Sequence, residues 1–486
     1  MSQNAARSSP RIAIVGAGFS GIGAAIRLRQ KGFRDVTVFE SSSQVGGVWA
    51  KNRYPGAACD IPSHLYSFSF APKSNWTHRY ARQPEILRYI QDCVQRFDLC
   101  DSIRLETNVE QAEFDAESQT WELSFGDQIQ DFDILISAVG QLNRPRIPDI
   151  EGLDSFEGPV VHTAQWPSHL DLTGKSVAVV GTGASAIQAI PQIAKSARKL
   201  TVFQRSPTWV KPFWDYEYSP FAKAIFRFLP GVRLLHRWWT YAVSEARIIA
   251  FYQGNEASRY IARKLRKHIR ARAPEELQAA LTPDFAVGCK RIPLSNHYYD
   301  TFQRPNVELV MAPVDRIGPK DVYAGEKQFA CDAVILATGF RATEFITPMQ
   351  VVGSSSQSLE EAWGQSGTAA YLGMLYPNFP NFFMLYGPNT NLGHNSIIFM
   401  IECQLRFLLN SIRQIWQRQS RNIEVSRSAF ESFQEETQRR MQPFVWNGDC
   451  SSWYKDAAGN IVNNWFGTSL EYWRRTRRLN REDFLP

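Results

Sequence analysis

The sequence predicts an α/β fold in which two similar doubly wound units share one chain, the second inserted in the first. Two glycine-rich turns, each between an apolar run and a helical pattern, predict the two units. A short apolar run at residues 381–387 predicts that the chain returns to the first unit. The length of 486 residues suits two or three domains.

The first unit opens with residues 11–40, in the order strand, glycine turn, helix, strand and acid. Glycines at such a turn let the backbone approach a pyrophosphate, which then sits at the helix N-terminus. A carboxylate after the second strand binds ribose hydroxyls. The stretch therefore predicts a dinucleotide site. Its candidate contacts are Gly16, Gly18, Gly21 and Glu40.

Residues 176–205 repeat this pattern with Gly181, Gly183 and Ser185 in the turn. From the first glycine to the end of the second strand the count is 40 − 16 = 24 in the first copy and 205 − 181 = 24 in the second. Arg205 thus takes the place of Glu40. A guanidinium binds the 2′-phosphate of NADP, which a carboxylate repels. A solvated charge at a strand end is the alternative for Arg205.

The two turns together predict two Rossmann-like dinucleotide-binding domains of the FAD/NAD(P)-linked reductase type. The first copy is interpreted as a site for FAD (or NAD) and the second as a site for NADPH. Two nucleotide sites in one chain indicate electron transfer between them. The simplest form of that transfer is reduction of a bound flavin by NADPH.

Further elements follow in chain order. Gly46 and Gly47 suit a close approach of backbone to a cofactor. Residues 83–97 have helical spacing, and residues 120–125 and 133–138 are expected to be strands. A stretch rich in proline and turn residues, 142–156, predicts the first domain boundary.

Strands are also expected at residues 306–311 and 332–337, and a helix near Ile397. Between the strands of the second unit, residues 216–281 have a helical, aromatic and basic pattern. We favour a packed helical subdomain with a solvated basic face. A membrane-surface helix and the wall of an apolar substrate pocket stay open as alternatives. The expected domains are 1–148 (first part of the FAD-binding domain), 149–341 (NADPH-binding domain, with the insertion 215–285) and 342–486 (second part and C-terminal tail).

Composition is that of an ordinary globular chain with a net charge of +7, and we expect no nucleic-acid partner. Seven cysteines without a CxxC pair or metal-ligand spacing indicate reduced thiols, no metal site and a cytoplasmic protein. Residues 1–11 are expected to be a short disordered lead rather than a signal peptide. The sequence has no apolar run of about 18 residues, so no membrane-spanning helix is expected.

Two further patterns resemble those of Baeyer–Villiger monooxygenases, the flavin enzymes that insert oxygen beside a ketone carbonyl. One pattern runs from Phe156 through Gly158, His162 and Trp166 to Pro167. The other joins Gly47 and Trp49 to Tyr54-Pro55-Gly56 and Asp60. The resemblance extends from Arg11 to about Glu402. It implies two dinucleotide-binding domains with a helical insertion.

The resemblance also implies roles for single residues. Arg291, before the stretch NHYYDTFQRPNV, corresponds to the active-site arginine of the family. Lys290 and Ser206 join Arg205 as contacts for the NADP phosphate. Asp60 lies beside the cofactor and positions Arg291. We interpret His162 as a linker residue that couples domain motion, although proton transfer is an alternative.

In that family reduced flavin and O2 give a flavin peroxide, which attacks the ketone while deprotonated. An arginine is always charged, so it stabilises the anion without protonating it. The implied substrates are O2 and an apolar ketone, and the implied product is an ester or lactone. The protein is expected to be a monomer or a homodimer.

Three other functions stay open at this point. A related flavin monooxygenase that oxygenates sulfur or nitrogen needs a protonated hydroperoxide and has no use for Arg291. A flavin-dependent NADPH reductase or oxidase of the disulfide class needs a redox cysteine pair beside the flavin, and the sequence offers no CxxC pair. A non-catalytic nucleotide-binding regulator has no need of Arg291 together with Asp60.

Overall fold

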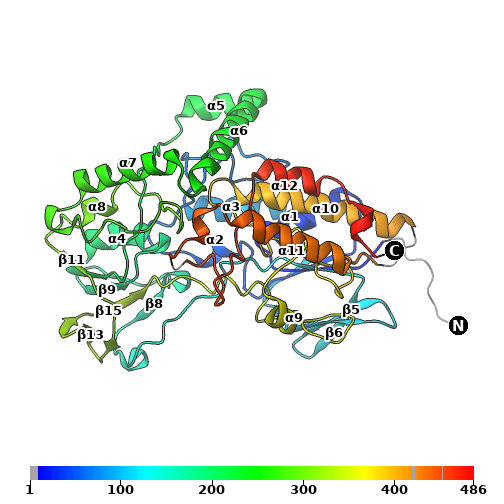
Figure 1. The fold of residues 1–486 in the computed structure, drawn as a ribbon, viewed down its shortest axis with the longest axis horizontal. Coiled ribbons are helices and arrows are strands. Elements are labelled where there is room, and N and C mark those ends of the chain that lie inside the picture. The colour runs from blue at the N-terminus through cyan, green and yellow to red at the C-terminus, as the bar shows by residue number, and fades with distance from the viewer. Residues whose placement is uncertain (1–8, 419–421, 451, 486) are drawn as a thin grey trace.

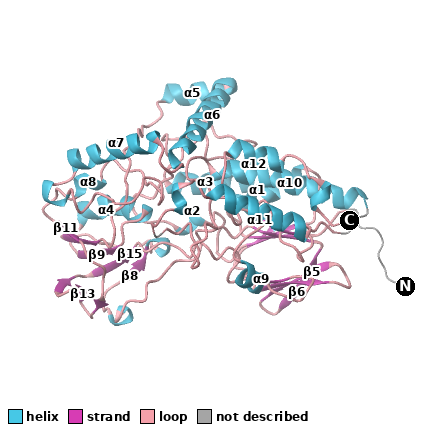
Figure 2. Cartoon of the chain, viewed as in Figure 1, coloured by secondary structure: helices cyan, strands magenta, loops and turns pink. Residues whose placement is uncertain are grey.

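A computed structural model describes residues 9–418, 422–450 and 452–485 of the chain, so most of the predicted N-terminal lead lies outside the described residues. Two parallel sheets lie side by side, and most of the helices gather along one side of them (Figures 1 and 2). The helical hairpin of α5 and α6 rises from that side, above the rest of the molecule in Figure 1.

The first sheet has the strand order β17-β7-β1-β2-β3, and all of its pairs are parallel. Its central strands are apolar at nearly every position because helices or a second sheet cover both faces. Its strands are β1 (Ile12–Val15), β2 (Val36–Phe39), β3 (Ile103–Arg104), β7 (Ile134–Ser137) and β17 (Phe382–Met384). The helices of this unit are α1 (Phe19–Gln30), α2 (Val48–Lys51), α3 (Gln83–Arg96), α10 (Ile397–Arg418), α11 (Arg427–Met441) and α12 (Ser469–Thr476).

The second sheet is also parallel, in the order β11-β10-β9-β15-β8. All of its strands lie in the chain between β7 and β17 of the first sheet, so the predicted insertion of one unit in the other is confirmed. Its strands are β8 (Val160–His162), β9 (Ser176–Val180), β10 (Lys199–Phe203), β11 (Val307–Val310) and β15 (Ala333–Leu336). Helices α4 (Ala184–Ser196) and α8 (Tyr298–Thr301) pack together beside this sheet.

Two small sheets complete the units. One adds β16 (Gln350–Val352), β4 (Gln111–Asp115), β5 (Thr120–Phe125) and β6 (Gln128–Phe132) to the first unit, with α9 (Leu359–Ser366) against β16. The other adds β12 (Arg316–Ile317), β13 (Asp321–Ala324) and β14 (Lys327–Ala330) to the second. Of these elements the sequence predicted β5 alone.

The helical insertion consists of α5 (Pro220–Phe228), α6 (Pro230–Glu245), a short 3-10 helix (Ala246–Phe251) and α7 (Glu256–Arg272). The solvated basic face expected for the insertion is present on α7, where Leu265 and Ile269 are buried while the basic side chains face solvent. The prediction of a packed subdomain is wrong for α5 and α6. Most of their large apolar side chains are exposed, although Phe226 and Tyr241 are buried, since the hairpin projects beyond the elements that would cover it.

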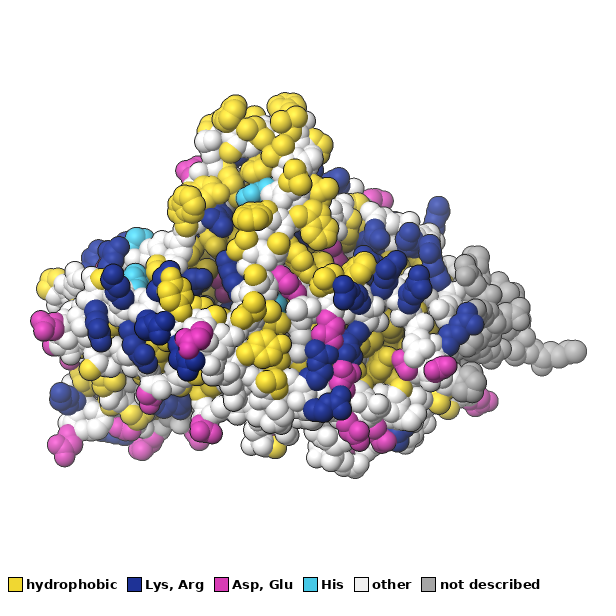
Figure 3. Space-filling model, turned by 45° about the horizontal axis from the view of Figure 1, so that its top comes forward, with side chains coloured by type: hydrophobic (Ala, Val, Ile, Leu, Met, Phe, Trp, Pro, Cys, Tyr) yellow, Lys and Arg dark blue, Asp and Glu magenta, His cyan; other side chains and the backbone are white. Residues whose placement is uncertain are grey.

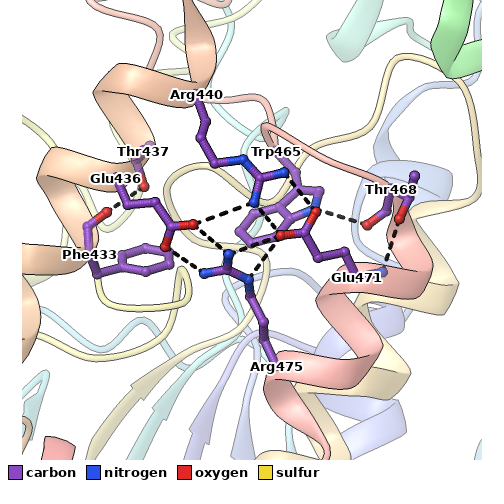
Figure 4. A network of polar contacts seen from close by, with 8 residues as sticks. All are labelled: Phe433, Glu436, Thr437, Arg440, Trp465, Thr468, Glu471 and Arg475. Carbon is purple, nitrogen blue, oxygen red and sulfur yellow. Dashed lines mark hydrogen bonds and ion pairs between the residues drawn. The ribbon is translucent and has the colours of Figure 1, made fainter.

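Four charged side chains join α11 to α12 in a network shown in Figure 4. Arg475 donates to both oxygens of Glu436, at 2.7 and 2.5 Å, and Arg440 donates to Glu471. The pKa of Glu436 is lowered, and the hydrogen bonding from Arg475 is the largest cause. This network joins the C-terminal helices α11 and α12.

The expectation that all cysteines are reduced is wrong for two of them. Cys289 and Cys450 form a disulfide across a sequence separation of 161 residues. Four of the five free cysteines are buried and Cys100 is exposed. The tail lies against the segment before Lys290, and this long-range contact has no local signature in the sequence. Over the described part of the chain, no helix combines the length and apolar content needed to cross a bilayer.

Candidate active site

The first glycine turn connects β1 to α1 and leaves an open backbone cradle. Gly16 has φ +107°, and a Cβ atom there would lie 2.6 Å from the carbonyl oxygen of Ala138. A Cβ atom on Gly47 would lie 3.0 Å from the Cα atom of Gly18, so these two backbones touch. No described side chain caps α1 at Gly18. Its first amides are therefore available to an anion, as a diphosphate requires.

Glu40 holds this cradle in shape. Its carboxylate accepts the backbone N–H of Ala17 at 2.9 Å and that of Ser42 at 2.9 Å, and the residue is buried. The third glycine of the turn, Gly21, packs against the turn itself, since a Cβ atom there would meet the Gly16 carbonyl oxygen. The ring N–H of Trp49 donates to Tyr66 at 3.2 Å. The predicted residues of the first unit thus gather in one place.

The second glycine turn has the same form. Gly181 has φ +106°, and a Cβ atom there would lie 2.7 Å from the carbonyl oxygen of Ala337. Gly183 is exposed and caps α4 without a side-chain hydrogen bond from the described residues, while Ser185 lies in the first turn of α4. The backbone amides of α4 are therefore open to a second anion.

Two cationic side chains, Arg205 and Lys290, lie close together just beyond this turn, after β10. Lys290 donates from Nζ to Oγ of Ser206 at 3.2 Å, and Thr182 donates from Oγ1 to the carbonyl oxygen of Ser206 at 3.1 Å. The pKa of Lys290 is lowered by burial and then by the charge of Arg205. Two cations at one strand end repel each other, and an anionic ligand would relieve that repulsion.

Asp60 and Arg291 form an ion pair between the two units. The guanidinium donates from Nε and Nη2 to Oδ2 of Asp60, at 3.0 and 2.5 Å. Asp60 follows α2 in the first unit, whereas Arg291 follows the helical insertion of the second. The charge of Asp60 raises the pKa of Arg291. The guanidinium side chain is 36% exposed, so the pair leaves part of it accessible.

Two tyrosines that the sequence did not reveal interact with this pair. Burial raises the pKa of Tyr386 and of Tyr454, whereas the charge of Arg291 lowers both pKa values. Tyr386 follows β17 and donates its hydroxyl to Oδ1 of Asn391 at 2.8 Å. Tyr454 belongs to the C-terminal tail. Neither residue stands in a motif, so only the folded chain brings them to Arg291.

Gln188 of α4 joins the second unit to the loop before Asp60. Its side-chain oxygen accepts the hydroxyl of Tyr54 at 2.9 Å, and its Nε2 donates to the carbonyl oxygen of Ala58 at 3.0 Å. Gly56 makes this approach possible. Its φ is +85°, and a Cβ atom there would lie 2.6 Å from the backbone oxygen of Gln188.

His162 lies where the chain passes between the units. Its Nδ1 accepts the backbone N–H of Ala164 at 3.1 Å, so the proton is on Nε2, which donates to the carbonyl oxygen of Gly339 at 3.1 Å. Burial lowers its pKa. The other predicted fingerprint residues lie on the same segment: Phe156 and Gly158 pack near β15, and Trp166 and Pro167 are half-buried after it.

The two passages of the chain between the units pair with each other. Pro145 and Phe340 form an antiparallel bridge. Arg146 donates its backbone N–H to Gly339 at 2.9 Å, and Arg341 donates to Arg144 at 3.0 Å. The connection is therefore a short two-stranded ribbon to which His162 is hydrogen-bonded.

A cavity of about 220 Å³ lies at the foot of α6. Pro62, two residues after Asp60, lines it together with Tyr216, Trp239 and Arg247. The charges of Arg247 and Asp60 both act on the pKa of Tyr80, which burial raises. The cavity therefore lies on the Asp60 side of the site.

Comparison with protein-family models gives a match to pyridine nucleotide-disulphide oxidoreductases over residues 13–228. A Baeyer–Villiger monooxygenase of Streptomyces coelicolor is 39% identical over 98% of this chain and 92% of its own length. A second Baeyer–Villiger monooxygenase, from Pseudomonas aeruginosa, is 36% identical over 97% of this chain and 90% of its own. An FAD-binding monooxygenase of Aspergillus niger is 36% identical over 98% of this chain and 81% of its own.

Solved structures agree with these relatives. The structure called OTEMO, in complex with FAD and NADP, superimposes with a TM-score of 0.89 at 27% identity, over 98% of this chain and 100% of that one. An oxidised steroid monooxygenase bound to NADP has a TM-score of 0.86 at 33% identity, over 97% of each chain. Cyclohexanone monooxygenase from Rhodococcus, bound to NADP+, has a TM-score of 0.86 at 27% identity, over 97% of each chain.

Proposed function

The chain belongs to the Baeyer–Villiger monooxygenase family, and from this we infer that it uses FAD, NADPH and O2 to convert a ketone into an ester or lactone. The single observation of this structure that carries the finer proposal is the ion pair between Arg291 and Asp60. It supports Arg291 as the catalytic group and Asp60 as the residue that positions it.

The first unit suits FAD. The cradle has no room for a side chain at Gly16 or Gly47, and the uncapped start of α1 at Gly18 offers amides to the diphosphate. The position of Glu40 after β2, beside the cradle, supports it as the contact for the ribose that follows. Trp49 lies next to this cradle in α2. We assign these residues to FAD binding.

The second unit suits NADPH. The open amides at Gly183 and Ser185 are placed for the diphosphate. Arg205, Ser206 and Lys290 offer two cations and a hydroxyl to the 2′-phosphate, as the Lys290–Ser206 hydrogen bond supports. NADH lacks that phosphate, so the charge pair supports a preference for NADPH.

When FAD and NADPH are bound, they supply the reducing electrons and the activation of O2. The chain then has to stabilise an anionic oxygen without protonating it. Arg291 suits that task, because Asp60 raises its pKa and orients its Nε and Nη2 atoms. Its remaining N–H groups can donate to the developing negative charge. Tyr386 and Tyr454 stay neutral beside it, since burial raises the pKa of both phenols.

We further propose the domain limits 1–148, 149–341 and 342–486. The limits fall beside the two-stranded ribbon of Pro145 and Phe340. Both ring nitrogens of His162 bond to backbone, which supports a role in coupling the units rather than in proton transfer. The substrate proposed here is an apolar ketone.

Replacing Arg291 by alanine tests the assignment. We expect NADPH to reduce the flavin of Arg291→Ala without air at a rate within about threefold of wild type, while product formation falls by about 10² or more. Ester or lactone formation from a panel of linear, cyclic and aryl ketones would be measured by mass spectrometry, beside the anaerobic reduction rate.

Arg272→Ala is the matched control, because it removes another arginine, paired with Asp300 at 3.0 Å, away from the site. It should retain product formation. Undiminished ester or lactone yield from Arg291→Ala would refute the role of Arg291. Sulfur or nitrogen oxygenation by both proteins, with no ester or lactone from either, would instead support the alternative class of monooxygenase.

A further inference from the structure

The α5–α6 hairpin carries a large apolar surface outside the body of the protein. Phe221, Phe228, Leu235 and Trp239 are each exposed by 70% or more of their surface. In Figure 3 these and neighbouring apolar side chains form the yellow prominence at the top of the molecule. Its other exposed members are Leu229, Val232, Leu234, Trp238 and Val243, with Trp214 just before α5. Folded proteins rarely leave so much contiguous apolar surface without a partner.

The charges on the hairpin itself are of one sign, while Asp215, Glu217 and Glu245 border it. From Pro220 to Ser244 the chain contains no Asp or Glu, and its cations include Lys223, Arg227 and Arg233. On one flank, α7 exposes Arg259, Arg263, Lys264, Arg266, Lys267, Arg270 and Arg272. On the other flank, α12 and the turn after it expose Arg474, Arg477 and Arg478. Figure 3 shows Lys and Arg side chains on both sides of the prominence.

The two flanks are fixed relative to the hairpin. Tyr241 of α6 shares a hydrogen bond of 3.0 Å with Ser469 at the start of α12. Glu245, at the end of α6, accepts from Ser469 and from Asn395, each at 2.6 Å. On the other side, α7 packs against the 3-10 helix that follows α6. The apolar tip and its basic borders thus form one preorganised surface.

We propose that the α5–α6 hairpin inserts its apolar tip into an anionic lipid membrane, with the basic side chains of α7 and α12 over the phosphate headgroups. Aromatic and aliphatic side chains surrounded by Lys and Arg are the composition of helices that lie in a membrane interface. Exposed Trp214, Trp238 and Trp239 add the ring type that prefers the headgroup level. The basic flanks match the negative surface of anionic lipids.

The same features disfavour a second copy of the chain as the partner. A symmetric dimer would place each prominence, with its own cations, against an identical surface. Arg227 and Arg233 would then face like charges with no acid between Pro220 and Ser244 to neutralise them, whereas Lys223 has Glu217 at 4.0 Å. A membrane, by contrast, accepts a convex prominence and supplies the opposite charge.

The test is sedimentation of the FAD-loaded full chain with vesicles of phosphatidylcholine alone or of phosphatidylcholine mixed with phosphatidylglycerol. We expect binding to the mixed vesicles that weakens about fivefold for each flanking cation removed and falls as salt is raised. Arg263→Gln, Lys264→Gln and Lys267→Gln in α7 measure the contribution of charge. The triple variant Phe221→Ser, Phe228→Ser and Leu235→Ser should abolish binding.

The matched control replaces exposed apolar residues outside the hairpin: Leu105→Ser, Ile129→Ser and Ile147→Ser, each at least 40% exposed in the wild type. It should bind mixed vesicles as the wild type does. Equal binding by the two triple variants, or none by the wild type, overturns the proposal. Conversion of a dimer to a monomer by the hairpin variant, in the absence of vesicle binding, would identify the surface as a self-interface. Reduction of FAD by NADPH is followed in each variant, so that a failure of the proposed chemistry is separated from a failure of membrane binding.

Discussion

Arg205 and Lys290 set the charge at the end of β10, where the second nucleotide turn opens. Their proximity is visible in the pKa of Lys290, which burial lowers and the charge of Arg205 lowers further. A hydroxyl lies with them, since Lys290 donates to Ser206. A site with two adjacent cations has its highest affinity for a doubly charged phosphate, because one ligand then relieves the repulsion between both cations.

Arg205→Ala should therefore weaken the apparent affinity for NADPH by about 10- to 100-fold, as expected for a lost hydrogen bond between charged groups. The affinity for NADH should change by less than about threefold, since no phosphate contact is lost. Titration of the two nucleotides against flavin reduction gives both values. Arg198→Ala is the control: Arg198 precedes β10, at the far end of the strand, and pairs with Asp332. Equal losses for NADPH and NADH would remove Arg205 from the phosphate site.

At this scale the sequence predicted residues that stand in motifs and missed those that do not. Arg291 and Asp60 are 231 residues apart, yet each belongs to a recognisable stretch, and the structure places them in one ion pair. Tyr454 and Gln188 reach the site only because the tail and α4 fold against it. The Cys289–Cys450 disulfide escaped prediction for the same reason, since its 161-residue separation leaves no local pattern.

The position of α6 depends on the residue at its end. Glu245 accepts hydrogen bonds from Asn395 and Ser469 at 2.6 Å each, and so ties the hairpin to α12. Burial alone raises the pKa of Glu245, but His394 at 3.5 Å and hydrogen bonds from Ser469 and Asn395 lower it to about 2. A carboxylate opposes the dipole at a helix C-terminus, so these donors are what stabilise its charge there.

Glu245→Gln should destabilise the protein by about 2 kcal/mol at neutral pH, the typical loss for hydrogen bonds to a charged group. Because the folded-state pKa is depressed, this contribution is fully present above the ordinary value of 4.5 and is lost as the pH falls toward about 2. Thermal unfolding of both proteins between pH 7 and pH 3.5 tests this: the difference should be constant above about pH 5.5 and shrink below 4.5. Glu256→Gln, at an exposed position of α7, is the control. A difference that grows as the pH falls would contradict the assignment.

Hydrophobic periodicity predicted the main strands and helices but did not predict what packs against them. The apolar runs became β1, β2 and the other central strands, because parallel strands are buried on both faces. Short polar strands such as β12 and β14 carry little periodic signal, and they were missed. The hairpin of α5 and α6 was misinterpreted for another reason: an amphipathic pattern reveals an apolar face and does not say what covers it.

The arrangement of the two units relative to each other depends on how closely they approach. The contact of the Tyr54–Ala58 loop with Gln188 brings the second unit against the loop that carries Asp60. The backbone of Gly56 lies close to that of Gln188, and its φ of +85° disfavours any other residue. The approach of α4 to this loop thus depends on the absence of a Cβ atom at one position.

Gly56→Ala should slow the reduction of flavin by NADPH by about tenfold or more, because the added Cβ atom forces α4 away at an overpacking cost of about 1–3 kcal/mol. Anaerobic stopped-flow spectroscopy gives the rate. Gly32→Ala is the matched control, since Gly32 has a similar φ of +92° and nothing within 4 Å of an added Cβ atom. Gly32→Ala therefore strains the backbone as Gly56→Ala does, but its Cβ atom meets no neighbouring atom. Similar reduction rates in the two variants would show that the approach of the units is not what Gly56 provides.

The paired passages between the units have a mechanical consequence. Two separate flexible linkers would leave one unit free to translate and to turn about any axis relative to the other. Here the passages are hydrogen-bonded into one ribbon at Pro145 and Phe340, and His162 fastens that ribbon to the second unit. The ribbon therefore holds the two passages together at one point between the units. Because the Asp60–Arg291 ion pair and the Cys289–Cys450 disulfide also join the two units, a relative motion has to be accommodated at all three connections.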